Sequence, residues 1–178
     1  MPQLLVITGA PASGKTTLAR ELAARYGAAL IAKDSIKEPL LDVLGAADRA
    51  ASRTLSDASF AVLFALGREQ LATGSSVLLE GNFRSLEHAA ALRALSAPAL
   101  RCAQVLCVME EGARRERLAR RAHDPARHAG HRDAELAHAG AAAENTWLDL
   151  PGERFLHDGG AAAPPSWLAT LDRWWREP

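Results

Sequence analysis

The sequence predicts an α/β fold built on a parallel β-sheet with helices on both faces. Two observations support this prediction. Five short apolar segments suited to strands are separated at nearly every step by longer segments with apolar residues at helical spacing. A glycine-rich loop also joins the first strand to the first helix, as in many sheets of this kind. Because no repeat or linker interrupts the 178 residues, we predict one domain spanning residues 1–178.

The glycine-rich loop occupies residues 9–16 and fits the pattern G-x-x-x-x-G-K-[ST] of the phosphate-binding P-loop. An apolar strand at residues 4–7 precedes it, and a helical pattern follows. Its backbone N–H groups can point at a phosphate, while Lys15 adds charge and the Thr16 hydroxyl binds Mg²⁺. The predicted nucleotide-binding residues are Gly9, Ala10, Pro11, Ala12, Ser13, Gly14, Lys15, Thr16 and Thr17.

A charged cluster follows the second predicted strand, a buried segment at residues 28–32. Ligand-binding groups gather at strand ends in open α/β sheets. Asp34 therefore has two compatible interpretations. It is an N-cap for a helix beginning near Ser35, or a general base facing an incoming hydroxyl. Pro39 fits the first turn of that helix better than its interior.

A second carboxylate follows the third predicted strand. Residues 49–73 predict a long helix that ends at Gly74, and residues 76–79 predict a buried strand that runs into Glu80. A carboxylate at a strand end, downstream of a P-loop, indicates a second acidic group near Mg²⁺. The alternative is that Glu80 serves only as a turn or helix-cap carboxylate.

The remaining elements complete the alternation. They are predicted helices at 85–96, 110–122, 133–146 and 166–176, and predicted strands at 100–108 and 154–157. Residues 159–165 are predicted to be flexible.

Cys102 and Cys107 lie on opposite faces of one strand, so we expect buried free thiols. The last helix has one face that we expect to pack on the sheet, formed by Trp167, Leu171, Trp174 and Trp175.

Arginines concentrate in residues 112–139, which we predict to be a lid. One interpretation is a solvated basic face. The other is a lid that closes over a triphosphate, because phosphoryl transfer depends on positioning and on cations near the transferred group. The favoured pair is Arg117 and Arg121, which share a helical face. The pairs that remain open are Arg114 with Arg117 and Arg120 with Arg127.

The histidines of this region are a weaker signal. His128 and His131 could share a metal ion, but neither a cysteine nor a firmly helical segment supports a metal site there. We therefore expect these histidines to make the loop polar or to contact the substrate rather than to bind a metal ion.

Charge and hydropathy exclude some partners. Basic and acidic residues number 21 each, so the formal net charge is zero and no global field attracts nucleic acid or membranes. No segment has the pattern of a signal peptide or the apolar length of a membrane span. We expect a cytoplasmic protein whose partner is a small molecule.

The chain resembles a group of small P-loop kinases that includes AAA-type kinases, chloramphenicol phosphotransferase, the 5′-hydroxyl kinase domain of polynucleotide kinases, gluconate kinase and the zeta toxins. The resemblance rests on residues 9–16, 33–37, 80–83 and 114–132. It implies a five-stranded parallel sheet of order 2-3-1-4-5. In the phosphotransferase and the polynucleotide kinases, an aspartate that Asp34 matches acts as base. Polynucleotide kinases carry a basic residue three positions later, which Lys37 matches in charge.

These features predict an ATP-dependent phosphotransferase that acts on a small-molecule hydroxyl, such as an antibiotic, sugar or nucleoside. The predicted catalytic residues are Asp34, Lys15, Arg117 and Arg121. The residues predicted to bind Mg²⁺, partly through water, are Thr16, Asp34 and Glu80. The predicted acceptor-side residues are Lys37, Asn82 and Arg84. Alternatives are a 5′-hydroxyl polynucleotide kinase, a zeta-toxin-like sugar-nucleotide kinase, and a nucleotide-binding regulator without turnover. No motif distinguishes ATP from GTP.

Overall fold

The computed structural model describes residues 1–96, 100–124, 128 and 146–176. Its strands are β1 (Gln3–Gly9), β2 (Ala29–Ala32), β3 (Val77–Glu80), β4 (Arg101–Val108) and β5 (Glu153–Asp158). Its helices are α1 (Lys15–Tyr26), α2 (Lys33–Leu44), α3 (Arg49–Ala72), α4 (Ser85–Leu95), α5 (Glu111–Ala122) and α7 (Pro165–Arg176). The predicted helix at 133–146 and much of the predicted lid lie outside the described residues.

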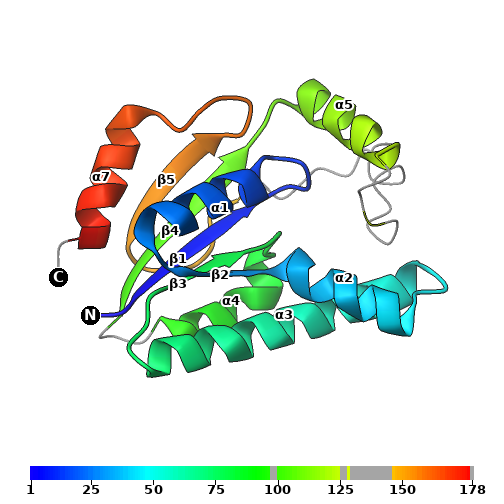
Figure 1. Ribbon diagram of the computed structural model, residues 1–178, viewed down its shortest axis with the longest axis horizontal. Helices are drawn as coiled ribbons and strands as arrows, with labels where there is room; N and C mark the ends of the chain where they lie inside the picture. Colours follow the sequence, from blue (N-terminus) through cyan, green and yellow to red (C-terminus); the bar gives the residue numbers. More distant parts are fainter. Residues whose placement is uncertain (97–99, 125–127, 129–145, 177–178) are drawn as a thin grey trace.

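All strand pairs are parallel, and the strand order is β2-β3-β1-β4-β5. The predicted fold class and strand order are therefore confirmed. Helices α1 and α7 cover one face of the sheet, and α3 and α4 cover the other (Figure 1). Since the strands are parallel, their carboxyl ends meet at one edge, where residues from distant parts of the chain come together.

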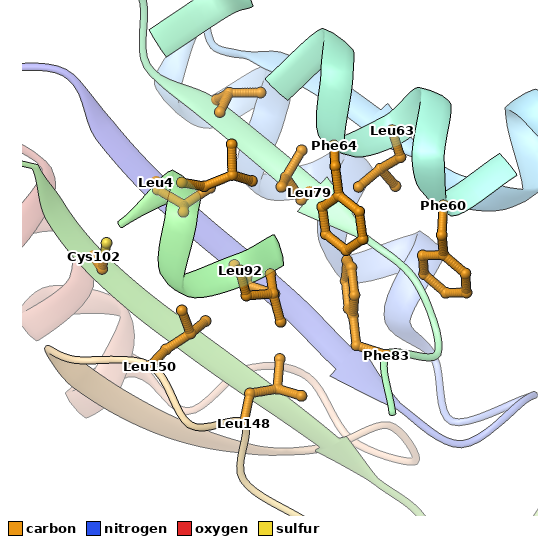
Figure 2. Packing of buried hydrophobic residues seen from close by; sticks show 13 residues of the cluster. Leu4, Phe60, Leu63, Phe64, Leu79, Phe83, Leu92, Cys102, Leu148 and Leu150 are labelled. Atoms are coloured by element: carbon orange, nitrogen blue, oxygen red, sulfur yellow. The ribbon is translucent and has the colours of Figure 1, made fainter. Parts of the chain in front are cut away.

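The core on the α3–α4 face is rich in leucine and phenylalanine. Phe60, Leu63 and Phe64 of α3 meet Leu92 of α4 over the strand residues (Figure 2). The segment after the predicted lid also enters this core through Leu148 and Leu150. Buried Gln104 of β4 holds that segment: its side-chain amide donates to the Leu148 carbonyl over 3.1 Å, and the Leu148 N–H donates back over 2.9 Å.

The opposite core lies between the sheet, α1 and α7. Leu18 and Leu22 of α1 pack there with Leu171 and Trp174 of α7. Tyr26 of α1 stacks on Trp175 with ring centroids 4.6 Å apart. The predicted packing of the last helix on the sheet is therefore present.

The two cysteines lie in different cores, Cys102 on the α3–α4 face and Cys107 on the α1–α7 face. Both are buried free thiols, as predicted from their spacing. Burial raises the pKa of Cys102 to about 11 and that of Cys107 to about 12, so both thiols are protonated at neutral pH.

Local signals set most helix ends. The Asp48 side chain accepts a bond from the Ala51 N–H and caps α3, while Glu110 caps α5 in the same way. α1 ends at Gly27, whose φ of +61° suits a left-handed C-cap.

Among the described residues, no helix combines the length and the apolarity that crossing a membrane would require.

The structure corrects three expectations about β2 and α2. β2 is not fully buried, because it is the edge strand of the sheet and has a neighbour on one side only. Asp34 is not an N-cap: α2 begins at Lys33, its N-cap position is Ala32, and Asp34 lies in the first turn. Pro39 is inside α2 rather than in its first turn, because the helix begins earlier than predicted.

Candidate active site

The P-loop follows β1 at the carboxyl edge of the sheet and leads directly into α1. Gly9 and Gly14 have φ angles of +141° and +88°, and Ala12 has a φ of +66°. A Cβ at Gly9 would lie 2.1 Å from the Cys107 carbonyl oxygen, so only glycine fits there. The loop thus adopts the backbone that its glycines predict, with the positive end of α1 beneath it.

Lys15 is buried, and its ammonium donates to the Ala10 carbonyl over 2.6 Å. Burial lowers the pKa of Lys15, an effect opposed mainly by the negative charge of Glu80. Its charge therefore lies inside the loop that is predicted to hold phosphates. The buried Ser13 hydroxyl has no hydrogen-bond partner within the described part of the chain.

Thr16 and Glu80 form the polar pair beside Lys15. The Thr16 hydroxyl donates to Oε2 of Glu80 over 3.2 Å. Glu80 ends β3, which pairs with β1 through Ile7. Burial raises the pKa of Glu80, while Lys15 pulls it down.

A hydroxyl next to a carboxylate fits Mg²⁺, which takes oxygen ligands and often binds one or two carboxylates together with phosphates. The described residues contain no cluster of three or more His, Cys, Asp or Glu side chains suited to a metal ion. Thr16 and Glu80 thus offer two oxygen atoms of the kind that Mg²⁺ takes as ligands.

Asp34 lies at the next strand end, in the first turn of α2. Its side chain is 39% exposed, and its Oδ1 lies 3.1 Å from the ammonium of buried Lys33. The charge of Asp34 reaches both Lys15 and Glu80, because it contributes to raising the pKa of each. The structure therefore brings Asp34, Lys15 and Glu80 into one electrostatic unit.

Two arginines of α5 are relevant to the P-loop. Arg117 donates through Nη1 to the carbonyls of Ala12, over 3.4 Å, and Gly159, over 3.3 Å. Arg121 lies close enough to Lys15 to contribute to lowering its pKa. Arg117 therefore contacts the P-loop directly, and the role of the pair Arg117 and Arg121 stays a prediction.

The alternative arginines are placed differently. Arg114 is buried and bonds to Glu111 on its own helix. Arg120 is exposed, and Arg127 lies outside the described residues.

The predicted acceptor-side residues come from two places, α2 and the turn between β3 and α4. Buried Lys37 donates to the Ser52 hydroxyl of α3 over 3.0 Å. Arg84 is 27% exposed and forms ion pairs with Asp57 at 3.1 Å and Glu87 at 2.8 Å. Asn82 is exposed. Lys37 thus contacts α3, and Arg84 contacts α3 and α4.

Of the two histidines considered for a metal site, His128 contacts Asp42: Nε2 of His128 lies 2.9 Å from Oδ1 of Asp42. His131 lies outside the described residues.

Sequence reasoning missed Gly159 as part of the site and treated its segment only as flexible. The Gly159 N–H donates to the Val108 carbonyl over 2.8 Å, which holds the residue at the end of β4. A Cβ at this position would lie 1.8 Å from the Ser13 carbonyl oxygen. The glycine therefore lets the β5–α7 connection press against the P-loop. The available signal was a Gly-Gly pair directly after a strand.

The strand order, the P-loop on the central strand and the acidic strand ends define a P-loop NTPase of the nucleoside-kinase-like type. The switch point of the sheet lies at β1, where α/β sheets of this class bind their ligands. The chain belongs to a family of AAA domains, whose sequence model matches residues 4–145.

Solved structures agree with this assignment. A proposed kinase from Chloroflexus aurantiacus J-10-fl is 29% identical with a TM-score of 0.85, and the match covers 99% of both chains. An APS kinase, CysC, of Mycobacterium tuberculosis, solved with AMPPNP and APS, is 19% identical with a TM-score of 0.56, covering 99% of this chain and 98% of that one. A sugar kinase from Janibacter sp. HTCC2649 is 16% identical with a TM-score of 0.56, covering 98% and 94%.

No curated protein matches the chain significantly. The small P-loop kinase group proposed from the motifs is thus supported by the family match and by these structural neighbours.

Proposed function

We propose that the protein is an ATP-dependent kinase that transfers the γ-phosphate to a hydroxyl group of a small molecule. One observation carries the proposal: Asp34 is a partly exposed carboxylate in the first turn of α2, directly after β2, at the same edge of the sheet as the P-loop, and its charge contributes to raising the pKa of Lys15 and of Glu80. A site for binding alone does not require a carboxylate in this position. The name of the 29% identical neighbour, a proposed kinase, supports the same function.

The chemistry divides among the residues of the site. The P-loop amides and Lys15 hold the β- and γ-phosphates, and Thr16 and Glu80 would hold Mg²⁺. When bound, the ion neutralises charge on the phosphate oxygens and orients them.

Asp34 takes the proton of the acceptor hydroxyl as its oxygen attacks the γ-phosphorus, and the bond from that phosphorus to the bridging oxygen breaks. ADP leaves, and Arg117 and Arg121 stabilise the charge of the transition state. Lys37, Asn82 and Arg84 are proposed to face the acceptor.

The test is a screen for ADP release with ATP and Mg²⁺ over sugars, nucleosides, antibiotics and other hydroxyl compounds. For the acceptor found, Asp34→Asn is expected to lower the rate of transfer at least about 100-fold, the usual contribution of a general base, with ATP affinity little changed. Asp149→Asn is the control, because Asp149 is an exposed partner of Arg93.

Unchanged transfer by Asp34→Asn would show that Asp34 is not the base. Tight ATP binding without ADP release on any acceptor would contradict the kinase proposal and favour a regulator. Transfer to an oligonucleotide 5′ end alone would favour a polynucleotide kinase.

A further inference from the structure

Ala12 of the P-loop has an unfavourable backbone conformation. Within the described part of the chain, it is the one residue other than glycine with a positive φ, which is +66°. In this left-handed region the Cβ of an alanine crowds the following carbonyl oxygen, so the conformation persists only where the surroundings hold it. The P-loop therefore needs contacts that keep Ala12 in place.

The peptide unit between Ala12 and Ser13 is bonded at both ends. Its carbonyl, which belongs to Ala12, accepts a hydrogen bond from Nη1 of Arg117 over 3.4 Å. Its N–H, which belongs to Ser13, donates to the carbonyl of Ala10 over 3.2 Å. Because the two groups of a trans peptide point in opposite directions, these bonds hold the unit from two sides. The bond from α5 joins residues that are 105 positions apart in the chain.

The same nitrogen ties Arg117 to the connection between β5 and α7. Nη1 also donates to the carbonyl of Gly159 over 3.3 Å. Gly159 itself lies against the P-loop, because a Cβ at Gly14 would be 3.1 Å from the Cα of Gly159. Arg117 is thus bonded both to the P-loop and to the segment that packs on it. These two partners restrict the guanidinium to a position from which it can hold the Ala12 carbonyl.

We propose that Arg117 is a positioning residue of the P-loop, which keeps Ala12 in its left-handed conformation and so preorganises the loop for phosphate groups. A loop that is already ordered binds its ligand more tightly, because the ligand does not have to order it. In this role Arg117 acts on the nucleotide through Ala12, in addition to the charge effect proposed above. The inference rests on nucleotide binding, the first part of the proposed function, and not on transfer to a hydroxyl.

The experiment is a double-mutant cycle between Arg117→Ala and Ala12→Gly. Glycine adopts a positive φ without strain, so Ala12→Gly makes the loop much less dependent on Arg117. The first readout is the affinity for a fluorescent ADP analogue, which lacks the γ-phosphate and with it the charge effect on the transferred group. We expect Arg117→Ala to weaken this affinity about fivefold to tenfold, because a left-handed alanine without support leaves only a fraction of the loops competent to bind. In the Ala12→Gly background, the same substitution should weaken it only about twofold.

The second readout needs no nucleotide. Hydrogen exchange of the Ser13 amide, followed by NMR, reports how often its bond to Ala10 opens. Arg117→Ala should speed this exchange at least about fivefold, because the peptide unit is then held at one end only.

Arg120→Ala is the matched control, because it removes the same charge from the same helix at an exposed position. It should change the ADP affinity and the Ser13 exchange rate less than about twofold, as is usual for a surface substitution.

Equal losses of ADP affinity from Arg117→Ala in both backgrounds would overturn the inference and assign Arg117 to direct contact with the nucleotide. Unchanged Ser13 exchange in Arg117→Ala would overturn it as well. A protein that binds no ADP would contradict the proposed nucleotide binding, while the Ser13 exchange would still decide whether Arg117 holds the loop. If Arg117→Ala does not fold, Arg117→Met keeps the side-chain stem and gives the same comparison.

Discussion

The hydroxyl of Thr16 lies 3.2 Å from the carboxylate of Glu80, although 64 positions separate them in the chain. The contact joins the P-loop to the end of β3, because β3 pairs directly with β1. It sets a hydroxyl and a carboxylate at a distance where one Mg²⁺ could bind both.

This pair predicts the metal dependence of the reaction. Glu80→Gln keeps the size of the side chain and an oxygen for Thr16, but it removes the charge. We expect the Mg²⁺ concentration for half-maximal activity to rise about 10- to 100-fold, as is typical when a supporting group of a metal site is lost. The measurement is a Mg²⁺ titration of ADP release at saturating ATP.

Glu69→Gln serves as the control, because Glu69 is exposed on α3. It should leave the Mg²⁺ requirement unchanged, and an unchanged requirement in Glu80→Gln would remove Glu80 from the metal site. Because burial raises the pKa of Glu80, wild-type Mg²⁺ affinity should begin to fall at a higher pH than for an exposed carboxyl as the solution is acidified.

The arginines of α5 allow a second matched test. Arg117 reaches the carbonyls of Ala12 and Gly159, whereas Arg120 is exposed on the same helix. Arg117→Ala should lower kcat at least about tenfold, since a cation near the transferred phosphoryl group stabilises its transition state. Arg120→Ala should change kcat less than about twofold. Equal effects of the two substitutions would indicate that the arginines form a general basic face without a specific role for Arg117.

Neighbouring glycines after β5 give a third test. A Cβ at Gly159 would lie 1.8 Å from the Ser13 carbonyl oxygen, whereas one at Gly160 would meet, among the described residues, only the Asp158 carboxylate, at 3.2 Å. Gly159→Ala must therefore displace the P-loop or its own connection. We expect it to weaken nucleotide binding at least about tenfold, whereas Gly160→Ala should be nearly neutral, and a fluorescent ATP analogue would measure both. Similar affinities in the two variants would show that the P-loop tolerates the shift.

His157 predicts a pH dependence of stability. It is buried at the end of β5 against Trp167, and within the described residues its Nδ1 has no hydrogen-bond partner. Burial lowers the pKa of His157 below its ordinary value of 6.5. Below pH 6.5, His157 therefore binds a proton more readily in the unfolded chain than in the folded chain.

The free energy of unfolding should consequently decrease as the pH falls below 6.5, by at most about 1.4 kcal/mol per pH unit from this group. His157→Phe should flatten that decrease, measured by urea unfolding at pH 7.5 and 5.5. His123→Gln is the control, because His123 is exposed at the end of α5. An unchanged slope in His157→Phe would assign the pH dependence to other groups.

Much of this architecture was predictable from the chain. The alternation of apolar strands with helical segments indicated the parallel sheet, and the P-loop spacing indicated the loop before α1. Errors arose where local pattern and tertiary position conflict. The apolar residues of β2 predicted burial, but the strand lies at the edge of the sheet. Asp34 has the residue type of an N-cap, yet α2 begins directly after β2 and places Asp34 inside its first turn.

Sequence alone determined the class of sheet, the P-loop and the candidate residues Asp34, Glu80 and Arg117. Only the tertiary structure decided that Lys33 is buried beside Asp34 and that Gly159 presses on the P-loop. The physical reason is that periodicity and spacing report which way a side chain faces within its own element. Its partners depend on which strand ends become neighbours when the crossovers pack, and those strands are far apart in the chain.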